Sequence, residues 1–214
     1  MAANLEFTED EYNVMHDATF FIHKKKITDK LFRLLGNLNV EIENLLSQYD
    51  EVLPAAVLTS KGKVNRGENY EQLPYVILDS PRLFINGDVF AFRTMFWWGN
   101  YFSCTVHLAG IYLAAFKPNL IEFITNDKSN SYYIGTGDDE WQHHLRADNY
   151  TPAVDILSNK AILNDVSEKP FFKVAIQLPL TKAGELGPEG IKFYKSFLDC
   201  YTRKRKYEYR DIGI

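Results

Sequence analysis

The sequence is poor in cysteine, with only Cys104 and Cys200 among its 214 residues. Two cysteines far apart, outside any Cys-x-x-Cys pair, provide neither a disulfide framework nor a zinc pattern, and they favour a reducing compartment. The first residues also lack the basic start and apolar stretch of a signal peptide. We therefore predict a cytoplasmic protein.

The chain lacks the short motifs of common enzyme classes as well. It has no Gly-x-Ser-x-Gly, and Gly135-Thr136-Gly137 lacks the continuation that a phosphate-binding loop needs. The net charge of −4 excludes a general attraction to nucleic acid or anionic lipid. We expect no cofactor and no nucleic-acid partner.

What the chain does have is apolar and aromatic material. Apolar residues make up 46% and aromatic residues 14%, enough in a chain of this length for a substantial core. No tract rich in proline, glycine or serine divides the sequence. We expect one domain over residues 1–214.

Residues 94–116, TMFWWGNYFSCTVHLAGIYLAAF, carry no Asp, Glu, Lys or Arg. The run could cross a bilayer, which takes about 20 apolar residues. However, Gly99-Asn100 between two β-rich segments is typical of a hairpin, and polar residues such as His107 are costly in hydrocarbon. We predict antiparallel strands at Val89–Trp98 and Tyr101–Leu108, and no membrane span.

A two-residue turn sets the expected register of this hairpin. It places Trp98 opposite Tyr101 and Phe92 opposite His107 on one face, and Arg93 on the other. Neither face is plainly solvent-exposed. A sheet covered on both sides and a sheet with one face lining a cleft both fit this pattern.

The flanking sequence predicts helices at both ends and further strands. Thr8 and Glu11 form a capping box that opens a helix running to about Lys24. The remaining expectations are a second helix from Thr28 with a break near Gly36, a loop over 50–69, strands at Leu73–Leu78, Tyr132–Ile134, Trp141–Leu145 and Phe171–Leu180, a short helix with Pro118 near its start, a helical turn around Val154–Leu163, and a final helix after Gly187-Pro188.

The fold class that follows is α+β. We expect a single domain with a mainly antiparallel sheet, centred on a hairpin at about 89–108. The N-terminal helices and the C-terminal helix should pack on that sheet.

The order of these segments resembles a known layout. A helical FTEDEY start, the loop Lys63–Gly67, YEQLPYVILD, an aromatic hairpin, FFKVAIQLPL and a terminal helix follow one another. This layout is similar to that of the uncharacterised bacterial YktB-type proteins. The resemblance implies a bacterial protein with an antiparallel α+β domain, and it brings no activity to carry over.

Arg93 is the first candidate site residue, because a charge within an aromatic strand is expensive to bury unpaired. It either pairs with a carboxylate such as Asp79 or Glu122, or faces a cleft and holds an anion bidentately. Its neighbours on the hairpin offer stacking and hydrogen-bonding groups. The predicted ligand-binding residues are Arg93, Trp98, Tyr101 and His107.

The second candidate site is the window DDEWQHHLRADNY at residues 138–150. Imidazoles and carboxylates close together are what a divalent metal needs, but the spacing matches no metal motif. We therefore expect no metal site here, and the residues that would be its candidate ligands are Asp138, His143 and His144. In a strand the two histidines point to opposite faces, so only one can join a given site.

Three functions remain open from the sequence. The first is a non-enzymatic binding or interaction domain, with an aromatic-lined cleft beside Arg93 for a small ligand or a protein partner. The second is a metal-assisted hydrolase using His143 or His144 with Asp138 or Asp139, and His107. The third is a self-associating structural protein whose aromatic surface around Trp98 is a dimer interface. We prefer the first.

Overall fold

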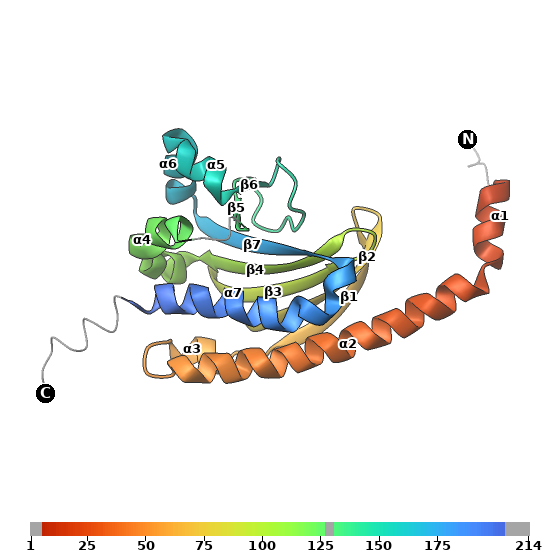
Figure 1. Ribbon diagram of the computed structural model, residues 1–214, viewed down its shortest axis with the longest axis horizontal. Helices are drawn as coiled ribbons and strands as arrows, with labels where there is room; N and C mark the ends of the chain where they lie inside the picture. The colour runs from red at the N-terminus through yellow and green to blue at the C-terminus, as the bar shows by residue number, and fades with distance from the viewer. Residues whose placement is uncertain (1–5, 127–130, 204–214) are drawn as a thin grey trace, which may run out of the picture.

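A computed structural model describes residues 6–126 and 131–203. Its strands form one antiparallel sheet in the order β1-β2-β3-β4-β7-β5-β6 (Figure 1). The strands are β1 (Lys63–Tyr70), β2 (Leu73–Ile85), β3 (Asp88–Trp97), β4 (Tyr101–Ala109), β5 (Tyr133–Gly135), β6 (Tyr150–Pro152) and β7 (Phe171–Pro179). The predicted α+β class with an antiparallel sheet is confirmed.

Helices precede, interrupt and follow the strands. They are α1 (Glu9–His16), α2 (Ala18–Leu46), α3 (Ala55–Leu58), α4 (Gly110–Thr125), α5 (Ala153–Ser158), α6 (Lys160–Glu168) and α7 (Leu186–Tyr201), with 3-10 turns η1 (Ser47–Tyr49) and η2 (Leu180–Glu185). Within the described ranges, we find no helix with both the length and the apolar content needed to span a membrane.

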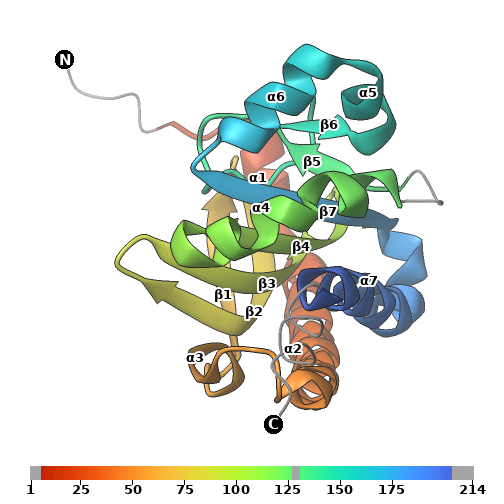
Figure 2. The ribbon, with the colours of Figure 1, turned by 90° about the vertical axis from the view of Figure 1, so that its left-hand side faces the viewer.

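The main core lies between one face of the sheet and the helices α2, α4 and α7 (Figure 2). Strand residues alternate between faces, so Phe90, Phe92 and Cys104 all point toward these helices and are fully buried. Helix α7 contributes Tyr194, whose ring stacks on that of Phe92 with 4.4 Å between the ring centres. Helix α2 adds Leu31, Leu35, Leu38 and Ile42, which recur at helical spacing.

The β3–β4 hairpin corrects the predicted register. Its strands lie where expected, but Phe96 pairs with Phe102 and Arg93 pairs with Thr105. The connection therefore holds three residues, Trp98 to Asn100, instead of two. A slip of one residue moves a whole strand to the other face, so Arg93 and His107, predicted on opposite faces, share one.

Several other boundaries differ from expectation. The loop predicted over 50–69 contains strand β1, and α2 continues without a break through Gly36. Helix α4 begins at Gly110 and carries Pro118 in its interior. The strand predicted at Trp141–Leu145 is a loop without regular structure. Strands β5 and β7 and helix α7 lie close to their predicted positions.

The capping box at the start of α1 is confirmed. The Glu11 amide donates to the Thr8 hydroxyl at 3.3 Å, and the Thr8 amide donates to Glu11 Oε2 at 2.7 Å. The helix ends early, because Asp17 leaves the helical region at φ −81° and ψ 75° and caps α2 instead. Helix α1 and the start of α2 project from the body (Figure 1); we call residues 6–27 the N-terminal arm.

Candidate functional site

Two rows of polar side chains cross the face of the sheet that the main helices leave uncovered. One row runs through Asp79, Arg93 and Thr105 on adjacent strands, and the next runs through His107 and Lys173. Of these, Lys173 is only 2% exposed and His107 and Asp79 are each 5% exposed. Burying ionisable groups costs free energy unless they are paired, so their partners decide what the rows can do.

Arg93 forms hydrogen bonds mainly with Asp79. Its Nε lies 2.7 Å from Asp79 Oδ1 and its Nη2 lies 2.9 Å from Oδ2, a bidentate pair. The remaining Nη1 lies 3.2 Å from His143 Nε2. The pairing of Arg93 with Asp79 is thereby confirmed. Since Asp79 occupies Nε and Nη2 and His143 lies against Nη1, no pair of Arg93 donors is free for the bidentate anion of the other alternative.

The connection between β5 and β6, residues 136–149, covers these two rows on the side of the sheet away from α2 and α7 (Figure 1). We call it the covering loop. The Tyr70 hydroxyl accepts the amide N–H of His143 at 2.8 Å and of His144 at 3.0 Å. The Tyr101 hydroxyl accepts the Leu145 amide at 2.7 Å. Side chains of the sheet, not a ladder of strands, thus hold the loop closed.

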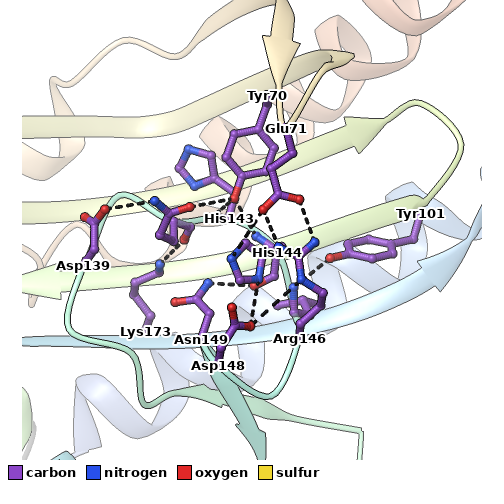
Figure 3. A network of polar contacts seen from close by, with 12 residues as sticks. Tyr70, Glu71, Tyr101, Asp139, His143, His144, Arg146, Asp148, Asn149 and Lys173 are labelled. Carbon is purple, nitrogen blue, oxygen red and sulfur yellow. Dashed lines mark hydrogen bonds and ion pairs between the residues drawn. The ribbon is translucent and has the colours of Figure 1, made fainter.

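Three groups of the covering loop point inward at the polar rows. Glu140 Oε2 accepts a hydrogen bond from His107 Nε2 at 2.8 Å. The Lys173 ammonium donates to the Gln142 carbonyl (Figure 3), and its Nζ lies 5.1 Å from the centre of the Tyr150 ring. His143 lies against Arg93 on one side and against the Tyr70 ring, at 5.2 Å, on the other.

A small cavity remains between the loop and the sheet. Its volume is about 10 Å³, which is the space that one water molecule takes by the same measure. Most of the lining is polar: Phe84, Ala91, Arg93, Met95, Ser103, Thr105, His107, Glu140, His143, Tyr150 and Lys173. A ligand larger than water enters only if the covering loop or one of its side chains moves outward.

Both histidines of the cavity are neutral at physiological pH. Burial, reinforced by Lys173 and Arg93, lowers the pKa of His107 to about 3. Burial, with Arg93 and then Lys173 beside it, lowers the pKa of His143 to about 2. A neutral imidazole donates one hydrogen bond and accepts one. Because an ionised carboxylate can only accept, the contact with Glu140 assigns the proton of His107 to Nε2.

Lys173 titrates close to neutrality. Burial, and then repulsion from Arg93, lowers the pKa of Lys173 to about 7. Burial also raises the pKa of Glu140, although the nearby Lys173 charge opposes that change. The two groups thus share a site in which the carboxylate and the ammonium stabilise each other.

The four predicted ligand-binding residues separate into three roles. Arg93 and His107 line the cavity. Tyr101 does not; it packs edge-on against Trp97 at 5.8 Å and holds the covering loop through Leu145. Trp98 packs toward the helix-covered core, with its ring 5.2 Å from that of Phe96, and it does not line this cavity.

The three candidate metal ligands are not brought together. Asp138 pairs with Lys169 at 3.0 Å on the surface. His143 points into the cavity, while His144 lies between Glu71 and Asp148 on the outer side of the loop (Figure 3). Across residues 6–126 and 131–203, we find no group of three His, Cys, Asp or Glu placed to hold a metal ion.

Two residues of the cavity were not predicted as site residues: Lys173, and Glu140, which lies in the window 138–150 but is not among its candidate ligands. A usable signal was present for the lysine, because Lys173 is the single charged residue in strand Phe171–Pro179 and stands in the same situation as Arg93. Nothing in the sequence placed Glu140 over the sheet, because its position depends on an irregular loop.

Compared with known proteins, the chain matches no family model, no curated protein and no solved structure. The resemblance to the YktB-type proteins stays a prediction.

Proposed function

We propose that this protein is a non-enzymatic binding domain for a small molecule that bears a carboxylate. The observation that carries the proposal is the position of Glu140. Its side chain comes from the covering loop, is 29% exposed, and reaches the buried imidazole of His107. In this position the Glu140 carboxylate stands where the carboxylate of a ligand would bind.

The chemistry of the pocket supports a carboxylate over other ligands. His107 offers an N–H donor and Lys173 offers an ammonium, both from rigid central strands, while Arg93 adds positive potential although its fork is occupied by Asp79. Donors fixed on a sheet need little reordering when a ligand binds. A carboxylate entering from solvent would displace Glu140 and exchange one charge-assisted hydrogen bond for another.

The covering loop supplies the entrance in this proposal. It lacks regular structure, and Tyr70, Tyr101 and the surface pair of Glu71 with Arg146 hold it. Loops of this kind open at a lower cost than core strands do. The ligand's remaining atoms would lie toward the solvent side of Glu140, near Trp141, whose ring lies 5.6 Å from that of His107.

The proposal is tested by replacing the internal carboxylate with one from solution. Glu140→Ala should bind acetate, seen as a shift of the His107 ring resonances by NMR, at least about tenfold more tightly than wild type. Adding Lys173→Met to that variant should abolish the binding. Glu189→Ala, which removes a carboxylate of α7 that is remote from the cavity and lies 3.7 Å from Lys192 Nζ, is the matched control and should behave as wild type.

Two results would overturn this function. One is a Glu140→Ala protein that folds normally and binds no small carboxylate. The other is acetate binding that survives Lys173→Met, because the carboxylate would then sit elsewhere. A positive result in both tests justifies titrating the wild type with mono- and dicarboxylic acids to find the natural class.

A further inference from the structure

The N-terminal arm is exposed along almost its whole length in a single copy of the chain. Every residue from Glu6 to His23 is exposed, and α1 buries no residue. The first buried residue of α2 is Thr28. One ion pair, Lys24 with Glu68 at 2.6 Å, ties the base of the arm to β1. An isolated helix as short as α1 is marginally stable in water. We therefore expect the arm to pack against a partner surface.

The arm carries large apolar side chains that the body does not cover. Between 47% and 59% of each remains exposed: Phe7, Tyr12, Val14, Met15, Phe20, Phe21 and Ile22. A hollow of about 390 Å³ on α1 lies among Phe7, Asp10, Glu11, Val14 and Met15. A concentration of exposed apolar groups of this kind marks an interaction surface.

The charges of the arm are divided by sign. From Glu6 to Asp17 every Asp, Glu, Lys or Arg is acidic, whereas residues 24–26 are three consecutive lysines. The break at Asp17 separates α1, which carries the acidic part, from α2, which carries the basic part. The arm is therefore complementary in charge to a second arm that runs in the opposite direction.

We propose that two copies of this chain associate by antiparallel pairing of their N-terminal arms. A two-fold axis near Asp17 would bring α1 of each copy against the start of α2 of the other. Glu9 and Asp10 then face Lys26 and Lys25 of the second copy. In the same register Val14 and Met15 face the second copy's Phe21 and Phe20, which gives an isologous interface.

An anionic membrane is the other surface that exposed aromatic residues beside lysines could fit. The acidic turn Glu9–Glu11 argues against it, because anionic lipid repels that part of the arm. A second copy satisfies both charged parts at once. The interface is also distinct from the dimer predicted around Trp98, which packs toward the core.

Sedimentation of the full-length chain gives the first test. Wild type should have twice the mass of one chain, and Val14→Ser with Phe21→Ser should halve that mass. Both positions are exposed, so the melting temperature of the body should stay the same when it is followed by near-UV circular dichroism. Ile111→Ser, at a 62% exposed position of α4, is the matched control and should stay dimeric.

A charge exchange tests the direction of pairing. Glu9→Lys with Asp10→Lys should weaken self-association, and so should Lys25→Glu with Lys26→Glu, because each variant sets like charges against each other. These choices spare the capping box of Glu11 and the link of Lys24 to Glu68. An equal mixture of the two variants should recover the mass of a dimer, since every charged contact is again opposite in sign.

Three outcomes would overturn the proposal. The first is a wild type that stays monomeric over a wide range of concentration, with or without binding to phosphatidylserine vesicles. The second is a dimer that the Val14 and Phe21 substitutions leave intact. The third is a mixture of charge variants that stays monomeric, which excludes antiparallel pairing.

Discussion

The two faces of the central strands differ although the same strands build both. On the helix-covered face Phe90, Phe92 and Val106 are fully buried among α4 and α7. On the loop-covered face, the neighbouring positions hold Arg93 and His107. Burial of the first set stabilises the fold, whereas burial of the second costs free energy. The difference indicates that the helix-covered face maintains the structure, whereas the loop-covered face carries the candidate site.

Truncating a buried side chain on the helix-covered face should give the largest loss of stability. Phe92→Ala removes a fully buried ring that stacks on Tyr194, and we expect the free energy of unfolding to fall by about 3–5 kcal/mol. Urea denaturation measures the loss. Ile85→Ala, at an exposed strand end, should change it by less than about 0.5 kcal/mol. Equal losses of unfolding free energy in Phe92→Ala and Ile85→Ala would contradict the structural role given to the helix-covered face.

The buried lysine should make stability depend on pH. The pKa of Lys173 is about 7 in the folded chain and about 10.4 when unfolded. Between these values the unfolded chain binds the extra proton, so stability should rise with pH. We expect a rise on the order of 3 kcal/mol from pH 7 to 10 that Lys173→Met removes.

Urea denaturation across that pH range measures the rise. The comparison uses the difference between wild type and variant, so that other titrating groups cancel. Lys160→Met, at an exposed position of α6, should keep the wild-type slope. An unchanged slope in Lys173→Met would mean that this lysine is not held as the structure has it.

Loosening the covering loop should have a smaller effect. Tyr70→Phe leaves the amides of His143 and His144 without their acceptor, at a cost of about 1–3 kcal/mol. Hydrogen exchange at these two amides should accelerate, while exchange in β3 and β4 stays slow. Tyr75→Phe, on the neighbouring strand, is the control. Equal acceleration across the central strands would show that the loop does not open separately.

The smallest loss of stability is expected from the exposed ion pair between Glu71 and Arg146 of the covering loop. Glu71 pairs with Arg146 through the two terminal guanidinium nitrogens, Nη1 and Nη2, but the Arg146 side chain is 54% exposed. Glu71→Gln should therefore lower stability by less than about 1 kcal/mol. The contribution of the Glu71–Arg146 pair to stability should decrease in high salt. Thermal melts of wild type and variant at two ionic strengths measure this decrease. A larger loss that salt leaves unchanged would place this pair in the structural core.

The sequence predicted the strands better than the site. Apolar and β-branched runs located β3, β4 and β7, because period-2 burial shows in residue type. Strand β1 was missed because its sequence, KVNRGENY, is mostly polar and half-exposed. The register failed because turn length cannot be read from Gly99-Asn100 alone, and one residue of slip exchanged the two faces.

The site required the register and the loop together. Arg93 and His107 were found as polar residues in an apolar run, but they meet because the hairpin connection has three residues. Lys173 and Glu140 come from segments far away in sequence, and the sheet order β4-β7 brings the lysine beside His107. Residue type alone carries no information on such long-range pairing.

The most direct test of the central claim is the titration of Lys173 itself. NMR of the protein labelled at lysine Cε and Nζ, assigned with Lys173→Met, follows its charge against pH. A buried ammonium beside Arg93, His107 and Glu140 should titrate with a pKa of about 7. A midpoint near the ordinary 10.4 of an exposed lysine would contradict a closed, charged pocket on this face of the sheet.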